Sequence, residues 1–222
     1  MKTSPATRAG TDAPAPKKTR GRPGLTDQDR EVALQAARVL LAEQGLNGLQ
    51  ARAIARKAGL SVGSIYKLFG DIDALVRFLN LETHQEFSAH HRAALAAISP
   101  DESDVETRLM VLARAYLDFV LANSARWEAV LHGSRRTDTS RPADYVQSED
   151  NLFAIVESVI ADVPGFAGPG QRARAARALW ASVHGIVSLT LANSRGSDPA
   201  AEAMAQIGVI LGAVIRDASA AQ

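Results

Sequence analysis

The side chains best suited to metal binding or proton transfer are five histidines, in a chain of 222 residues that has no cysteine. His84 and His91 share one helical face, but seven residues of helix separate them by about 10 Å along the axis. One metal ion cannot span that distance without further ligands, and the adjacent His90 and His91 diverge around a helix. We therefore expect histidines that face solvent or a partner, and no metal site.

Catalytic groups at useful spacing are also missing from the sequence. It contains no Ser/His/Asp set and no Gly-rich phosphate loop between a strand and a helix, and the glycine-containing segment 165–170 is interpreted as a connector between helices. Without cysteine there is neither a thiol nucleophile nor a disulfide framework. The sequence predicts a protein that is not an enzyme and needs no cofactor.

Charge is distributed unevenly along the chain. Residues 1–70 hold 12 basic and 5 acidic residues, a net charge of +7, whereas residues 71–222 hold 13 basic and 19 acidic residues, a net charge of −6. This asymmetry indicates an N-terminal part that binds a polyanion and a body with another role. DNA, RNA and an anionic membrane are all compatible with the charge alone.

The basic part divides into an arm and three short helices. Residues 1–24 are rich in Pro, Ala, Thr, Gly and cations and lack apolar periodicity, so we expect a disordered basic arm. From Thr26 the 3.6-residue apolar spacing predicts a helix of about five turns, ended by a glycine, and further helices fit residues 50–58 and 62–69. Gly59 in the turn and Ser61 as a cap make the last two helices a helix-turn-helix signature.

The remainder of the chain is predicted to be helical throughout. No segment alternates with period two, and Pro- and Gly-bearing separators divide the apolar runs. The fold class is therefore all-α, with a helix-turn-helix domain over residues 25–71 and a helical body over residues 72–222. The helices expected in the body are 72–97, 102–122, 125–131, 143–162, 171–194 and 199–218.

One stretch of the sequence closely resembles a known family. Residues 53–69 read AIARKAGLSVGSIYKLF and are followed by Asp73-Ala74-Leu75, and this pattern resembles the DNA-binding domain of TetR/AcrR-type bacterial regulators. The preceding segment 20–24, RGRPG, is similar to the basic arm that often leads into that domain. The segment from Trp180 to Gly185, which includes His184, is similar to the Trp…His-Gly signature of one C-terminal subgroup.

The resemblance implies a homodimer that binds double-stranded operator DNA through an N-terminal three-helix unit, with residues 62–69 as the recognition helix in the major groove. Its hydroxyls and cation can hydrogen-bond to bases and phosphates, and Gly63 allows close backbone approach. The basic arm would add minor-groove or phosphate contacts. Val62, Ile72 and Gln50 depart from residues common in the family. The DNA-contact candidates are Lys17, Lys18, Arg20, Arg22, Ser61, Val62, Gly63, Ser64, Tyr66 and Lys67.

The body offers aromatic and histidine side chains for a pocket that suits a small amphipathic effector. The alternative is that most of them belong to the core or to a dimer interface. These pocket candidates are Tyr116, Phe119, Trp127, His132, Trp180 and His184.

The last two helices carry apolar stripes beyond what a small body needs inside, and these can form a four-helix bundle across a two-fold axis. The stripes are Ala173, Ala176, Trp180, Val183 and Val187 on one helix, and Met204, Ile207, Gly208, Leu211, Gly212 and Ile215 on the other.

The leading hypothesis is a cytoplasmic transcriptional repressor that a small-molecule effector releases from its operator. The alternative is a DNA-bound adaptor whose body recruits a protein partner. We expect no membrane span, since no run of about 18 apolar residues lacks a charge, no secretory signal in the first thirty residues, and no membrane binding by an arm without apolar anchors.

Overall fold

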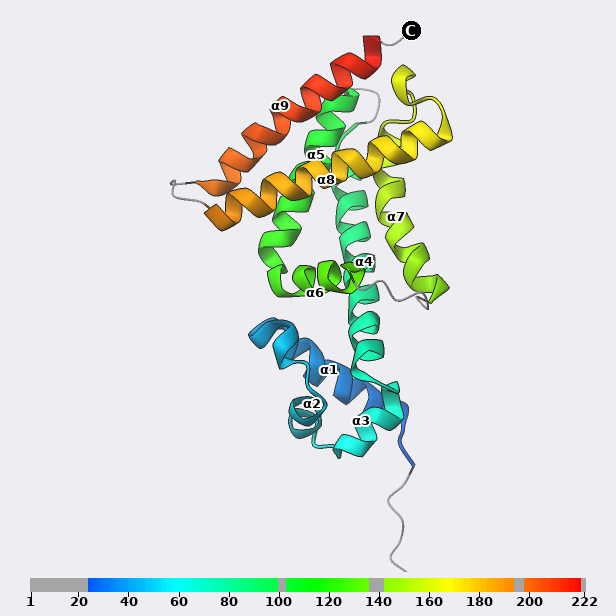
Figure 1. Cartoon of the computed structure of the whole chain (residues 1–222), viewed down its shortest axis with the longest axis vertical. Helices are drawn as coiled ribbons and strands as arrows, with labels where there is room; N and C mark the ends of the chain where they lie inside the picture. Colours follow the sequence, from blue (N-terminus) through cyan, green and yellow to red (C-terminus); the bar gives the residue numbers. More distant parts are fainter. Residues whose placement is uncertain (1–23, 100–102, 136–141, 194–197, 221–222) are drawn as a thin grey trace, which may run out of the picture.

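The computed structural model describes residues 24–99, 103–135, 142–193 and 198–220, and these form helices and turns without a strand (Figure 1). The all-α prediction is confirmed. Lys17, Lys18, Arg20 and Arg22 of the predicted arm lie outside the described residues. The elements are α1 (Asp27–Gln44), η1 (Gly45–Gly48), α2 (Ala51–Ala58), α3 (Val62–Phe69), α4 (Ile72–Ala96), α5 (Val105–Ala122), α6 (Ser124–Arg135), α7 (Ala143–Val159), η2 (Pro164–Phe166), α8 (Pro169–Asn193) and α9 (Pro199–Ala220).

Side-chain caps explain where several helices begin. Thr26 and Asp29 form a capping box at the start of α1, and Asp71 accepts the backbone N–H of Ala74 at the start of α4, at 2.6 Å. Asp104 accepts from the N–H of Thr107, so α5 begins at Val105 and not near residue 102 as expected. Each cap satisfies a donor that the first turn leaves without a partner.

The helices enclose two separate hydrophobic cores. The first belongs to the head, which we define as residues 24–71, together with the beginning of α4; its fully buried side chains include Ile54, Ile65 and Leu75. The second belongs to the body and is built from α4, α5, α6, α7, α8 and α9. Ala129 of α6 is buried in the head core, so α6 is the body helix that packs against the head.

Figure 1 shows the head and the body at opposite ends of the long axis, with α4 running from one to the other. α6 lies across the molecule between them and packs on α1, η1 and α4. At the far end α8 and α9 pack on each other, with α5 and α7 beneath them. A displacement of α4 or α6 would therefore move the head relative to the body.

Two expectations from the sequence are wrong. His84 and His91 were expected at the surface, yet they are 1% and 5% exposed because the face of α4 that carries them is covered by other helices. The stripes of α8 and α9 expected at a dimer contact are also covered, since the body core of one protomer contains Ala176, Val183 and Val187 of the first and Ile207, Leu211 and Ile215 of the second. A periodic stripe shows which residues share a face and not which surface covers it.

Candidate functional site

The turn between α2 and α3 is built from residues suited to it. Gly59 adopts the left-handed conformation with φ of 68°, where a glycine avoids the clash of a Cβ atom, and the N–H of Leu60 bonds to the carbonyl of Ala55 at 2.9 Å. Ser61 then caps α3, since its hydroxyl accepts the N–H of Ser64 at 3.1 Å and lies 2.8 Å from the Ser64 hydroxyl. The helix-turn-helix geometry follows from these local bonds.

The outer face of α3 is free of the head core. Ile65 is the buried residue of the helix, whereas Tyr66 is 49% exposed and Lys67 is exposed. Gly63 is also exposed, and a Cβ atom there would meet no neighbour nearer than the Ser61 hydroxyl at 3.9 Å. Internal packing therefore gives no reason for this glycine, and its position suits the close approach of an external surface.

The remaining sequence-predicted contacts of α3 lie on the same exposed end. Ser61 is exposed, and Val62 and Ser64 are half-buried. One hydrogen bond links the two serine hydroxyls, which leaves the hydroxyl that accepts it able to donate outward. The six predicted residues thus lie together at the start of α3 and its cap, and four of them, Ser61, Ser64, Tyr66 and Lys67, carry side chains that can donate hydrogen bonds.

Arg30 of α1 fixes the other end of α3. Its Nη1 donates to the carbonyl of Leu68 at 3.0 Å, and its guanidinium carbon lies 4.7 Å from the centroid of the Phe69 ring and 5.2 Å from that of Phe78. Cation–π contact with rings from α3 and α4 holds the three helices in one arrangement. Arg30 was not among the sequence-predicted residues.

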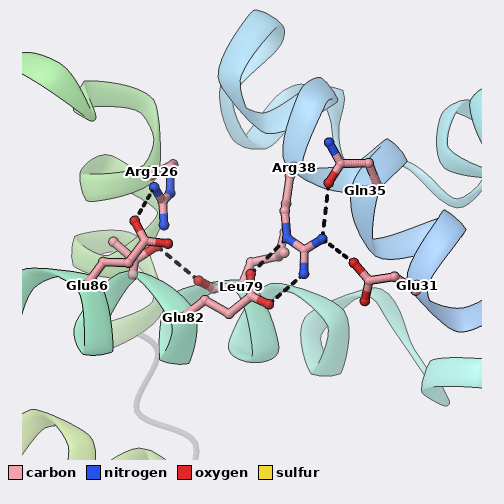
Figure 2. Close-up of polar contacts among 8 residues, drawn as sticks. Glu31, Gln35, Arg38, Leu79, Glu82, Glu86 and Arg126 are labelled. Atoms are coloured by element: carbon pink, nitrogen blue, oxygen red, sulfur yellow. Dashed lines mark hydrogen bonds and ion pairs between the residues drawn. The ribbon is translucent and has the colours of Figure 1, made fainter.

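Arg38 joins α1 to α4 at the junction of head and body (Figure 2). Its Nε and Nη2 donate to the carboxylate of Glu82 at 3.0 and 2.7 Å, and its Nη1 donates to Glu31 at 2.7 Å. The hydrogen bond to Glu82 is the main reason that the pKa of Arg38 rises above its usual value. The paired geometry is the fork that arginine forms with carboxylates.

A second ion pair follows one turn along α4. Arg126 of α6 donates to Glu86 at 2.7 Å, and Figure 2 shows this pair beside the Arg38 network. Buried Asn80 of α4 donates to the carbonyl of Ala129 in α6 at 3.1 Å. α4 therefore contacts the head through Glu82. On the adjacent turns it contacts α6 through Asn80 and Glu86.

The body contains a small apolar cavity of about 40 Å³. Tyr116 is the lining residue with a polar side-chain group that is hydrogen-bonded, and the described residues that line the cavity include no charged side chain. Trp180 contributes its ring, while its Nε1 is buried without a hydrogen-bond partner among the described residues. The lining residues are Leu109, Leu112, Ala113, Tyr116, Val156, Leu179, Trp180, Val183 and Leu211.

The hydroxyl of Tyr116 connects the cavity to α6 and α8. It accepts the Nε1–H of Trp127 at 2.9 Å and lies 2.6 Å from Nδ1 of His184, whose ring stacks on Trp180 at 5.1 Å. Burial raises the pKa of the Tyr116 hydroxyl, so the group stays neutral in this network. A single hydrogen bond, from Trp127 to Tyr116, thus links the cavity wall to α6.

The pocket candidates from the sequence fall into three groups. Tyr116 and Trp180 line the cavity, and His184 supports both of them. Phe119 and Trp127 are buried core residues whose rings pack edge-to-face at 6.0 Å. His132 is exposed on α6 and does not line the cavity.

Sequence reasoning missed the buried polar face of α4. Nδ1 of His84 lies 2.7 Å from the hydroxyl of Ser148 in α7, and His91 stacks on Phe87 at 3.8 Å with its Nδ1 2.9 Å from the Phe87 carbonyl. Burial lowers the pKa of His91 to about 4. Four positions of α4 recur at intervals of four, three and four: Asn80, His84, Phe87 and His91. This is the spacing of a core-facing helix stripe, and it is the signal that could have located them.

Comparison with known sequence families gives two matches on the same chain. Residues 33–78, which span the helix-turn-helix, match the family described as bacterial regulatory proteins, tetR family. Residues 109–218 match the tetracyclin repressor-like C-terminal domain, which covers the body from α5 to α9. No protein in the curated collection matches significantly.

Solved structures share the whole fold. A protein of unknown function from Rhodococcus sp. RHA1 is 24% identical, with coverage of 88% of this chain and 98% of its own and a TM-score of 0.68. The transcriptional regulator FadR from Bacillus subtilis in complex with stearoyl-CoA is 14% identical, with coverage of 87% and 99% and a TM-score of 0.58. The multidrug binding protein EbrR complexed with imidazole is 23% identical, with coverage of 82% and 93% and a TM-score of 0.58.

Proposed function

The chain belongs to the TetR family of bacterial regulatory proteins and is a DNA-binding transcriptional regulator, and from that premise we propose that it is a cytoplasmic repressor released from its operator by a small-molecule effector. The observation that carries the DNA-binding part is the outer face of α3. Ile65 holds the helix in the head core, while Tyr66 and Lys67 project to solvent beside the Ser61–Ser64 cap. This face can enter a major groove without any change in the head.

Within that proposal each side chain has a distinct task. The serine hydroxyls and Lys67 hydrogen-bond to base edges or phosphates, the Tyr66 hydroxyl reaches a phosphate, and Val62 contacts a thymine methyl group. Lys17, Lys18, Arg20 and Arg22 neutralise phosphates next to the groove that α3 occupies. The positive charge of residues 1–70 supports these roles.

A homodimer would present two such faces to one operator. Leu189 of α8 is 66% exposed, and Val209 and Ile210 of α9 are 70% and 40% exposed, so apolar side chains remain on these helices after the body core is formed. By length and composition α8 and α9 could also cross a membrane, but they pack on α5 and α7 of a regulator fold. We propose that a second copy of the chain covers these exposed side chains. The two recognition helices of such a dimer, about 34–36 Å apart, would bind a near-palindromic operator.

The body cavity is the proposed effector site. Since none of the described lining residues is charged, burying an ionised group there would be costly, and an uncharged apolar effector fits best. A hydrogen-bond acceptor on the effector could bind the buried Nε1–H of Trp180. The described cavity of about 40 Å³ is smaller than ligand pockets of about 300–1,000 Å³, so effector entry requires the walls to move apart.

Expansion of the cavity would be transmitted to the DNA-binding head through α6. Displacing Tyr116 strains its hydrogen bond with Trp127, and α6 carries Trp127 on one side and Ala129, in the head core, on the other. α6 in turn is tied to α4 through Arg126 and Glu86. The effector must favour the expanded, DNA-incompetent arrangement, because equal affinity for both arrangements would shift nothing.

The small volume of the cavity also favours a second candidate function, a DNA-bound adaptor whose body recruits a protein. The two candidates differ in one measurement. A neutral apolar compound that raises the melting temperature and weakens operator binding supports the repressor. A compound library without effect on either quantity supports the adaptor.

Operator binding is tested by selecting bound sequences from random DNA and measuring the affinity of variants. Tyr66→Phe and Lys67→Ala should each weaken binding by about 1–3 kcal/mol with an unchanged circular dichroism spectrum. Arg114→Ala is the matched control, because Arg114 is an exposed cation of α5 in the body, paired with Asp118. If both α3 variants bind like this control, α3 is not the recognition helix.

The arm is tested by the salt dependence of operator binding. Each phosphate contact contributes a slope of about 0.9 in log K against log salt concentration. Replacing Lys17, Lys18, Arg20 and Arg22 together by alanine should therefore reduce the slope by up to about 3.6. An unchanged slope would exclude a role for the arm in DNA binding.

A further inference from the structure

A hollow of about 240 Å³ lies at the junction of head and body, and its residues are distinct from those of the body cavity. Its walls come from the end of α3, the first turns of α4 and the start of α7, with Arg30 of α1 beside them. It has about six times the volume of the body cavity and approaches the size of small-molecule pockets, about 300–1,000 Å³.

Aromatic rings form much of the wall. The guanidinium carbon of Arg30 lies 4.7 Å from the ring centroid of Phe69 and 5.2 Å from that of Phe78, and Tyr145 of α7, which is 2% exposed, lies in the wall behind them. Flat ring faces favour a planar occupant that stacks on them in an offset or edge-to-face arrangement. The stack of Arg30 on both rings keeps this wall in place.

The charged side chains of the hollow differ in whether they already have hydrogen-bond partners. Arg30 donates to the carbonyl of Leu68, and Asp144 accepts the N–H of Tyr145 at 2.9 Å. Arg77 is half-buried and has neither a hydrogen bond nor an ion pair within the part of the chain that the structure describes. Two guanidinium groups face one carboxylate, so the hollow favours an anion, and the open fork of Arg77 fits a carboxylate in a bidentate pair.

We propose that this junction hollow is a second small-molecule site, which binds a planar aromatic carboxylate between Arg77 and the half-buried rings of Phe69 and Phe78, against the start of α7. The occupant contacts α3, α4 and α7 at the same time, so it stabilises the arrangement of head and body seen in Figure 1. The described residues of this site include none that line the body cavity and none of the predicted DNA contacts.

Three isosteric probes test the class of ligand on the full chain. Benzoate, benzamide and benzamidine share a ring and a planar substituent and carry charges of −1, 0 and +1. Ligand-observed NMR titration should give the order benzoate, benzamide, benzamidine from tightest to weakest, with benzoate in the millimolar range, about 1–10 mM, for so small a ligand. Equal affinities, tighter binding of benzamidine, or no benzoate binding below about 20 mM would overturn the proposal.

Variants locate the bound probe. Arg77→Gln should weaken benzoate binding about tenfold, the equivalent of one hydrogen-bonded charge contact. Arg92→Gln is the control on the same helix, because Arg92 lines a different hollow that has no aromatic wall residue among those described. Asp144→Asn keeps the acceptor for the Tyr145 N–H, removes the opposing charge, and should tighten benzoate binding. Equal benzoate affinity in Arg77→Gln and Arg92→Gln would refute the site.

Operator affinity of the wild type is measured in the same preparation. Loss of operator binding with intact benzoate binding would contradict the proposed function alone. Intact operator binding without any effect of Arg77→Gln on benzoate would contradict the junction site alone.

Discussion

Replacing Arg38 by methionine is expected to loosen the attachment of the head to α4. The guanidinium donates two hydrogen bonds to Glu82, and the two side chains are 32% and 26% exposed. Exposed ion pairs contribute about 0.2–1 kcal/mol, whereas breaking a buried pair costs about 3–5 kcal/mol. A bidentate pair of intermediate exposure lies between these limits, so Arg38→Met should lower the free energy of unfolding by about 1–2 kcal/mol.

A double-mutant cycle isolates the pair from the other contacts of Arg38. Glu82→Gln keeps the shape of the side chain and removes its charge, and the double variant should be no less stable than Arg38→Met alone. We expect a coupling energy of about 1 kcal/mol, which falls as salt screens the exposed part of the pair. Arg114→Met serves as the control because Arg114 and Asp118 are 59% and 44% exposed, and it should cost about 0.5 kcal/mol or less.

The assay is urea unfolding at one protein concentration, since dimer stability depends on concentration. Both tryptophans, Trp127 and Trp180, lie in the body, so fluorescence follows the body while circular dichroism follows every helix. The head has a separate core, and Arg38→Met should therefore shift the circular dichroism transition further than the fluorescence transition. Operator affinity should fall in parallel, because α1, which holds α3 through Arg30, would be attached less firmly to α4.

Two results would refute this reasoning. A coupling energy below about 0.3 kcal/mol would mean that Arg38 and Glu82 act independently. A loss of stability in Arg38→Met no larger than in Arg114→Met would mean that the junction pair contributes no more than an ordinary surface pair.

Two further predictions concern the body. Because burial lowers the pKa of His91 to about 4 from 6.5, the unfolded chain binds a proton that the folded chain excludes, and stability is full above about pH 6.5 and falls as the pH drops toward 4. Urea unfolding should show a loss of about 2 kcal/mol between pH 7.5 and 5 that His91→Gln removes and exposed His90→Gln keeps; an equal loss in both variants would contradict it. Gly165→Ala should cost about 1–3 kcal/mol, since a Cβ atom there would lie 2.7 Å from the carbonyl oxygen of Ala218, whereas at Gly170 its nearest neighbour is 3.7 Å away. Equal thermal stability of the two alanine variants would show that the backbone around residue 165 yields freely.

Local signals in the sequence determined the head almost completely. Gly59 and Ser61 predicted the turn and the start of α3, because a left-handed glycine and a hydroxyl cap act within a few residues of their own position. Ile65 of this segment is fully buried and fixes α3 in the head core. The class of protein followed from this segment, since the fixed spacing of many residues distinguishes the family.

The contacts between helices were decided by tertiary structure. Arg38 and Glu82 are 44 residues apart, and nothing in the periodicity of α1 or α4 pairs them. The apolar stripe of α9 was assigned to a dimer contact, yet α5 and α8 of the same protomer cover it and leave Val209 exposed instead. Helical spacing determines which side chains share a face, whereas the partner of that face depends on how long helices cross, and that is set by packing summed over the whole chain.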